Sequence, residues 1–183
     1  MVKKYIEFIT ESDDHSTANM LKNFARLSSG YQKEYFERKL SCLRPIEIHS
    51  VYDLFESDVI DRLRKYGRFQ KKECYSNSLH AANILESIGK LSVNGQVMEN
   101  PEVKYVEGYM TVIGIPIDHA FNKIGDYYFD VTVDFLLDSK DKGDYNVIGE
   151  WDYREALSIM AEEGYYGGVF DTLFKNSYKE NVR

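Results

Sequence analysis

Apolar residues recur three and four residues apart over the first third of the chain, a pattern typical of amphipathic helices. One stripe runs over residues 20–27 and a second over residues 31–40, and Pro45 then breaks the pattern. The most regular stripe comprises Val51, Leu54, Phe55, Val59, Leu63 and Tyr66, with Gly67 directly after it. We therefore predict that residues 1–67 form a helical scaffold.

The middle of the chain begins with one more helix. Apolar positions predict a helix from Cys74 to about Ile88, and its buried face carries Leu79, Ala82 and Leu85. Pairs of Asn-Gly and Asn-Pro after the helix predict a loop. The helical pattern ends at this loop.

Three strands are predicted after the loop. The first, Val103 to Ile115, is rich in β-branched and aromatic residues, and Pro116 ends or bends it. Two shorter strands, 119–124 and 127–133, flank the pair Gly125-Asp126. Glycine at the first central position suits a type II′ hairpin turn. We therefore expect a small antiparallel meander.

The end of the chain reads as a loop and two helices. The charged, glycine-containing stretch 139–144 predicts a surface loop. Asp152 and Glu155 resemble a capping box at the start of a helix that Gly164 ends. A last short helix is expected after Gly167-Gly168.

Together these elements predict one domain of the α+β class, with helices segregated from a small sheet. Residues 1–67 are the helical scaffold. Residues 68–138 are the core, in which a helix packs on the sheet, and residues 139–183 add the C-terminal helices.

Composition and charge narrow the classes of function. The 183 residues suffice for one domain with a real core, and 43% hydrophobic and 29% charged residues are typical of a globular protein. A net charge of −7 argues against a nucleic-acid partner. No apolar run is long enough to span a bilayer, and Glu7 comes too early for a secretory signal. We therefore expect a cytoplasmic protein with no membrane partner.

The cysteines and histidines do not predict a disulfide framework or a metal site. There are only two cysteines, Cys42 and Cys74, and we expect both to be reduced. The histidines show no zinc-site spacing, and no glycine-rich phosphate loop is present. No metal and no cofactor is therefore predicted, and nothing in the sequence specifies an oligomeric state.

Cys74 stands at a predicted helix start, where a thiol can become a strong nucleophile. The thiolate is the attacking form, and the unpaired N–H groups and dipole of a helix N-terminus favour it. A nearby imidazole can hold the thiol proton. We therefore expect Cys74 to act with a histidine.

The predicted hairpin places His119 and Asp130 on one face of the sheet. With Gly125-Asp126 as a two-residue turn, Phe121 faces Asp130, and His119 shares the face of Phe121 because side chains alternate along a strand. His119 and Asp130 are then diagonal neighbours, roughly 7–8 Å apart at the backbone. With Ile124-Gly125 as the turn they would be directly opposite. In both cases the carboxylate can fix the tautomer of the ring while its other nitrogen meets the thiol.

Four motifs resemble the transglutaminase-like branch of the papain-like superfamily. They are Cys74-Tyr75-x-Asn77, Tyr105-Val106-Glu107-Gly108-Tyr109, His119-Ala120-Phe121-Asn122 and Asp130-x-Thr132. In that group a cysteine on a helix is followed by an HAW-type strand and a D-P-T-type strand. Here Phe121 stands in place of the tryptophan, and Val131 stands in place of the proline.

This resemblance covers about residues 70–135 and implies a role for each matching residue. It implies Cys74 as nucleophile, His119 as general base and acid, and Asp130 as the residue that orients the histidine. It also implies the backbone N–H of Cys74 as one donor to an oxyanion. The superfamily includes transglutaminases, peptidases, deamidases and acetyltransferases, so the resemblance indicates a mechanism and leaves the substrate open.

Other polar residues near these motifs are candidates for support. Gln70 is a candidate amide donor to the oxyanion, with an ordinary surface glutamine as the alternative. Tyr75 and Asn77 flank the nucleophile, and we expect both to support the helix start. Glu107 is expected to be a solvated strand carboxylate, with a place in the cleft as the alternative.

The predicted function is a cysteine-dependent hydrolase or acyltransferase that acts on amide bonds through an acyl-enzyme. A peptide or protein amide is the expected substrate of such a peptidase, amidase or deamidase. The first alternative is a non-catalytic protein-binding module, which the fifteen tyrosines would suit. The second is an amine acyltransferase that uses acetyl-coenzyme A.

Overall fold

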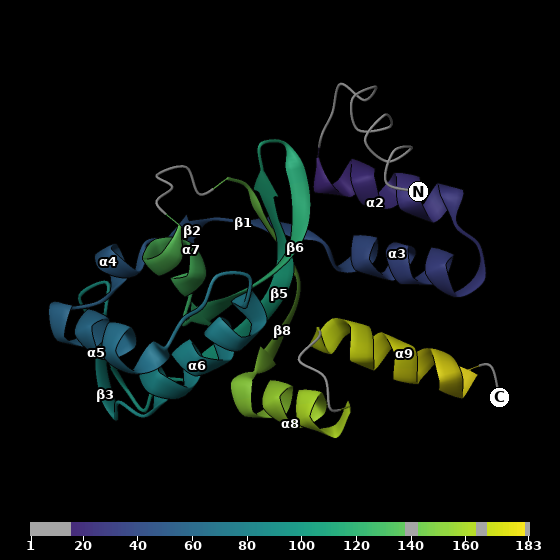
Figure 1. Ribbon diagram of the computed structural model, residues 1–183. Helices are drawn as coiled ribbons and strands as arrows, with labels where there is room; N and C mark the ends of the chain where they lie inside the picture. The colour runs from purple at the N-terminus through teal and green to yellow at the C-terminus, as the bar shows by residue number, and fades with distance from the viewer. Residues whose placement is uncertain (1–15, 138–142, 164–167, 182–183) are drawn as a thin grey trace.

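A computed structural model describes residues 16–137, 143–163 and 168–181 (Figure 1). The helices are α2 (Thr17–Leu27), α3 (Gly30–Cys42), α4 (Val51–Leu54), α5 (Ser57–Gly67), α6 (Cys74–Glu86), α7 (Val131–Leu136), α8 (Tyr153–Glu163) and α9 (Val169–Asn181). The strands are β1 (Arg44–Ile46), β2 (Ile48–His49), β3 (Lys90–Val93), β4 (Gln96–Glu99), β5 (Val103–Val112), β6 (Ile115–Ile124), β7 (Tyr127–Phe129) and β8 (Tyr145–Asp152). The protein is therefore a mixed α and β structure.

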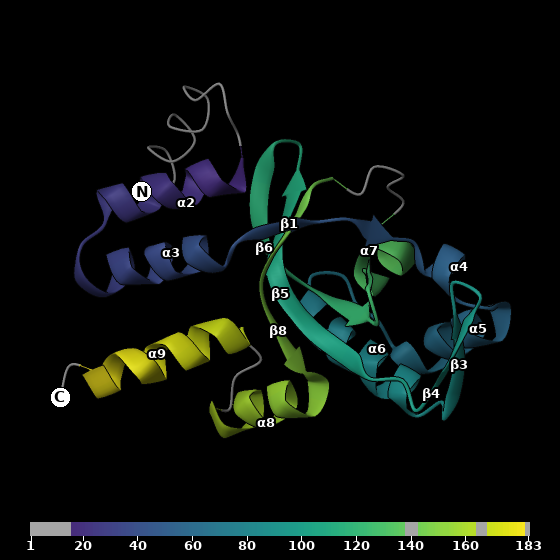
Figure 2. The same cartoon turned by 180° about the vertical axis from the view of Figure 1, so that it is seen from behind.

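Six strands form one curled sheet in the order β1-β8-β5-β6-β7-β2. All neighbours pair antiparallel except β2, which runs parallel to β7. In both cartoon views, α2, α3 and α9 lie to one side of the central strands, and α4 to α7 lie to the other (Figure 2). The expected small sheet with segregated helices is thus wrong in detail, because helices flank a larger sheet on both sides.

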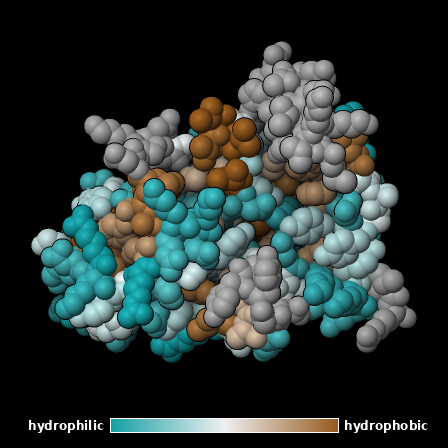
Figure 3. Space-filling model, viewed as in Figure 1, coloured by the Kyte–Doolittle hydropathy of each residue, from teal (hydrophilic) through white to brown (hydrophobic). Residues whose placement is uncertain are grey.

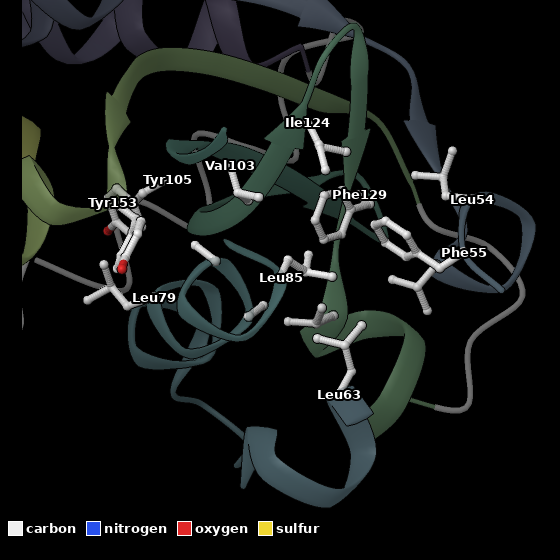
Figure 4. Close-up of a cluster of buried hydrophobic side chains, with 14 of the residues drawn as sticks. Leu54, Phe55, Leu63, Leu79, Leu85, Val103, Tyr105, Ile124, Phe129 and Tyr153 are labelled. Carbon is white, nitrogen blue, oxygen red and sulfur yellow. The ribbon is translucent and has the colours of Figure 1, made fainter. Parts of the chain in front are cut away.

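The largest core cluster forms where α6 packs on β5 and β6. Leu79 and Leu85 of α6 point toward Val103 and Tyr105 of β5, and Phe129 closes the cluster from β7 (Figure 4). All five side chains are at most 5% exposed. The predicted packing of the cysteine-bearing helix on the sheet is confirmed. This contact fixes the position of Cys74 relative to β6.

Gly108 allows β8 to approach β5 very closely. A β-bulge shifts the pairing of these strands between Glu107 and Gly108. A Cβ atom at Gly108 would clash with the carbonyl oxygen of Asn146, so only glycine fits there. On its other side Gly108 lies opposite His119 of β6. Gly108 therefore shapes the sheet beside the candidate site.

Several predicted boundaries are wrong for identifiable reasons. The stripe over residues 51–66 is divided between α4 and α5, because Phe55 is extended and forms a β-bridge with Val93. The loop at Asn94-Gly95 is the turn of the β3–β4 hairpin, with both residues at positive φ. Pro116 does not end the strand that begins at Val103, because the chain turns earlier and Pro116 lies within β6.

The C-terminal part contains a strand that was not predicted. β8 begins after the charged loop, of which residues 138–142 lie outside the described residues. The part of the expected capping box that concerns Asp152 is confirmed, since its Oδ1 accepts a hydrogen bond from the N–H of Arg154 at 2.9 Å. The predicted helix end at Gly164, and Gly167, also lie outside the described residues.

The tip of the β5–β6 hairpin is an exposed apolar part of the surface. Figure 3 shows it as a brown projection. Its exposed apolar residues are Val112, Ile113, Ile115 and Ile117. Ile113 is 96% exposed and has a φ of 50°, which is unusual for a β-branched residue. Within the described ranges, no helix has the length and apolar character that crossing a bilayer requires.

Candidate functional site

Cys74 is the first residue of α6, as predicted, and Glu73 precedes it as the N-cap. The Glu73 side chain does not cap the helix, so the N–H groups of the first turn can face a negative charge. The Cys74 thiol is free and partly buried against the core. Cys74 therefore occupies the helix start at which it was predicted.

Asn77 holds the segment that leads into this helix. Its side-chain oxygen accepts the N–H of Gln70 at 3.0 Å, and its amide donates to the carbonyl oxygen of Gln70 at 2.8 Å. The same amide donates to Oγ1 of Thr132 in α7 at 3.1 Å. Asn77 is only 1% exposed, so these bonds are shielded from water. The prediction that Asn77 supports the helix start is confirmed.

His119 lies on β6 and is almost completely buried, with 5% of its surface exposed. Its Nε2 atom lies 2.6 Å from Oδ2 of Asp130. The Cys74 side chain lies near enough to His119 to contribute to the raised pKa of the imidazole. Because Nε2 faces the carboxylate, Nδ1 is the nitrogen left for the thiol. The structure thus places His119 in contact with Asp130, with Cys74 close to the same ring.

Asp130 uses both carboxylate oxygens. Oδ1 accepts the backbone N–H groups of Thr132 at 2.8 Å and Val133 at 3.1 Å, and so caps α7. Oδ2 accepts from His119 and from the hydroxyl of Tyr145 at 2.8 Å. Asp130 is completely buried, and these four donors compensate its lost hydration. Its geometry therefore suits an ionised carboxylate.

The protonation states follow from this arrangement. Burial alone would lower the pKa of His119, but the Asp130 carboxylate and the Cys74 side chain outweigh it and raise this pKa to about 10. Burial likewise opposes ionisation of Asp130, yet His119 and the Tyr145 hydroxyl bring its pKa below the usual value. Both shifts favour an imidazolium paired with a carboxylate.

The position of Asp130 differs from the prediction in one respect. The strand expected over residues 127–133 ends at Phe129, and Asp130 is the N-cap of a helix. The predicted two-residue turn is confirmed, since Ile124 pairs with Tyr127. In the sequence, the β-branched residues after Asp130 favoured a strand. In the structure, the Asp130 side chain accepts two backbone N–H groups, and this capping favours a helix start. The contact with His119 is kept, because Asp130 directly follows β7, and β7 pairs with the strand that carries His119.

Tyr75 and Gln70 occupy different environments beside Cys74. Tyr75 is half-buried and packs against the core cluster, and burial, together with Glu107, raises its pKa. The Gln70 side chain is exposed, and only its backbone is held by Asn77. Its suggested role as an amide donor stays a prediction.

Glu107 is not the solvated carboxylate that was expected. It is 3% exposed and accepts hydrogen bonds from the Tyr105 hydroxyl at 2.7 Å and from the N–H groups of Val169 and Phe170 at 2.5 and 3.1 Å. Burial raises its pKa to about 7 despite these donors. Glu107 therefore fastens the start of α9 to β5, close to Tyr75.

Lys39 is a buried charge that sequence reasoning missed. It is the only buried residue of α3, and its side chain is 4% exposed. Its ammonium lies 2.8 Å from Oδ1 of Asp118 and 3.7 Å from Oδ1 of Asp171, over the ring of Tyr35. The only sequence clue is a lysine one position before Leu40 on a helix of weak amphipathicity. This ion pair links α3 to Asp118, the residue directly before His119 on β6.

Comparisons of the chain with protein-family models, curated proteins and solved structures give no match. The described residues also contain no group of three or more histidine, cysteine, aspartate or glutamate side chains arranged to hold a metal ion. The interpretation of the site therefore depends on its own geometry.

Proposed function

We propose that the protein is a cysteine-dependent hydrolase or acyltransferase that acts on amide bonds. The observation that carries this proposal is the buried contact of His119 with Asp130, together with the closeness of Cys74 to the same imidazole. A thiol at a helix start, an imidazole and a buried carboxylate in this order support nucleophilic catalysis by the thiol. Cys74 is the nucleophile, His119 the general base and acid, and Asp130 the positioning residue.

The proposed reaction has two halves. The Cys74 thiolate attacks the carbonyl carbon of an amide, and a C–S bond forms as the carbonyl oxygen becomes an oxyanion. His119 then gives its proton to the amide nitrogen, the C–N bond breaks, and an amine leaves. In the second half, water or an acceptor amine attacks the thioester while His119 takes a proton from it. The C–S bond then breaks. The products are a carboxylic acid or a new amide, and the Cys74 thiolate and the protonated His119 are restored.

The oxyanion needs donors that are already in place. The N–H of Cys74 belongs to the first turn of α6 and is the first proposed donor. The side-chain amide of Gln70 is the second, because Asn77 fixes the backbone of Gln70 close to the helix start. A Gln70→Ala variant should lose activity without losing stability.

The fold proposed for this site is papain-like, of the transglutaminase-like branch. Three features support it: the cysteine opens a helix that packs on a curled sheet, the histidine lies on a central strand, and the acid directly follows the next strand. Peptidases, deamidases and acyltransferases all use this arrangement, so a peptide or protein amide is the proposed substrate.

A second candidate function is a protein-binding module without catalysis. The exposed apolar tip around Ile113 favours it, because such residues are common at protein contacts. Under this alternative, replacing Cys74 would leave the biological activity intact.

The proposal is tested with 4-nitrophenyl acetate, a small acyl donor that requires no knowledge of the natural substrate. We expect release of nitrophenol, a mass increase of one acetyl group on the Cys74 peptide, and loss of both in Cys74→Ser. Added hydroxylamine separates transfer from hydrolysis by collecting the acyl group. Equal acetylation of Cys42 and Cys74, with no turnover, would contradict the proposal.

A further inference from the structure

Tyr145 donates a hydrogen bond to the same oxygen that contacts His119. Its hydroxyl lies 2.8 Å from Oδ2 of Asp130, and Nε2 of His119 lies 2.6 Å from this atom. Tyr145 is the first residue of β8 and is 2% exposed. Asp130 Oδ2 therefore shares its charge between two donors that come from different strands.

The single hydroxyl hydrogen of Tyr145 has two acceptors within reach. The sulfur of Met110 lies 3.0 Å away, but a thioether is a weak acceptor. An ionised carboxylate is a much stronger one, and hydrogen bonds to it are shorter and stronger than neutral ones. The hydroxyl hydrogen is therefore directed to Asp130.

We propose that Tyr145 is a positioning residue that limits how strongly Asp130 holds the proton of His119. This inference rests on the proposed function, because a carboxylate that binds the Nε2 proton less tightly leaves His119 readier to give up the proton on its other nitrogen, Nδ1. A donor that stabilises the carboxylate makes it a weaker acceptor for the imidazolium. A histidine held too tightly by its carboxylate would be a poor acid toward the leaving amine.

The surroundings of His119 contain few other groups able to have this effect. The titratable groups that face it are Cys74 from α6, Asp130 before α7 and Tyr145, whose ring lies 6.1 Å from the His119 ring. Asp118 precedes His119 on β6, but its carboxylate is bound to Lys39. Of these groups, only Tyr145 acts on His119 through the carboxylate.

Tyr145→Phe removes one oxygen atom and keeps the packing of the ring. The matched control is Tyr128→Phe, because Tyr128 belongs to the same buried cluster but its hydroxyl contacts Arg44 and Glu150. The measurement is the resonance of the proton on Nε2 of His119, in the full chain labelled with ¹⁵N-histidine at pH 7. Thermal unfolding of each variant verifies that it is folded.

We expect the Nε2 proton to move downfield in Tyr145→Phe, because Oδ2 loses its competing donor and binds the imidazolium more tightly. The apparent pKa of His119 should rise by about half a unit. Tyr128→Phe should leave the Nε2 resonance and the pKa of His119 unchanged. Met110→Leu should leave them unchanged too, because the Tyr145 hydroxyl donates to Asp130 and not to the Met110 sulfur.

Three outcomes decide the matter. An unchanged Nε2 resonance in Tyr145→Phe overturns the inference, and so does an equal shift in Tyr128→Phe, which would indicate a general packing effect. Alkylation of Cys74 in the unmodified protein tests the proposed function separately. An ordinary slow thiol together with a shifted Nε2 resonance would reject the enzyme and retain the link from Tyr145 through Asp130 to His119.

Discussion

His119 and Asp130 approach within 2.6 Å, between Nε2 and Oδ2, although they belong to different kinds of element. Asp130 is the N-cap of α7, while His119 lies within β6. One carboxylate therefore starts a helix with one oxygen and holds the histidine with the other. Formation of α7 and assembly of the candidate site are coupled through this side chain.

Replacing Asp130 should separate these two tasks. Asp130→Ala loses the cap and leaves His119 without its charge partner, so we expect a loss of at least about 2 kcal/mol in the free energy of unfolding. Asp130→Asn keeps an oxygen for the cap but loses the charge, so its chief effect should be a lower pKa of His119. Urea unfolding and the histidine resonances measure the two effects. Asp126→Asn, at an exposed turn, is the control and should change neither.

Glu107 should give the stability of the protein a distinct pH dependence. Its pKa is raised from 4.5 to about 7 by burial, so the folded state favours the protonated form. The stabilisation is complete below pH 4.5 and is lost as the pH rises to about 7, with a slope of at most about 1.4 kcal/mol per pH unit. Glu107→Gln should remove this slope. The pH dependence of stability that comes from His119, between pH 6.5 and about 10, should remain. So should the dependence that comes from Asp130, below pH 3.8. Chemical denaturation at a series of pH values provides the test, and an unaltered slope in Glu107→Gln would refute the assignment.

Lys39 should contribute more to stability than any exposed lysine of the same helix. Lys39→Ala empties a site surrounded by aromatic rings and removes the partner of two carboxylates. These carboxylates are more than half exposed, so they regain water, and we expect a moderate loss of about 2 kcal/mol. The control is Lys33→Ala, whose side chain is 52% exposed. Similar melting temperatures for the two variants would show that Lys39 has no special role.

The parts of the fold that follow from local pattern were predictable. The helix that Cys74 opens was predictable because Leu79, Ala82 and Leu85 recur at helical spacing, and the turn at Gly125-Asp126 follows from its glycine. β8 was missed because its pattern is interrupted at Gly149 and its pairing depends on the bulge near Gly108. Such pairing joins distant segments and leaves no local trace in the sequence.

The candidate site was predictable to the extent that strand alternation determines it. Alternation placed His119 and Asp130 on one face, and their contact is present. The second partner of Asp130, Tyr145, was missed because the strand that carries it was missed. Glu107 looked like any strand carboxylate, because its partners are N–H groups of a helix that begins sixty-two residues later.

The most direct test of the account is the rate at which iodoacetamide alkylates Cys74 compared with Cys42 at pH 6.5, followed by mass spectrometry of the two peptides. We predict that Cys74 reacts at least about tenfold faster, because His119 lies where it can take up the proton of the attacking thiol. His119→Ala should abolish this advantage. The control is His80→Ala, which replaces an exposed histidine on the helix that carries Cys74 and should retain the advantage. Equal rates for the two cysteines, or a fast Cys74 that does not depend on His119, would contradict the account.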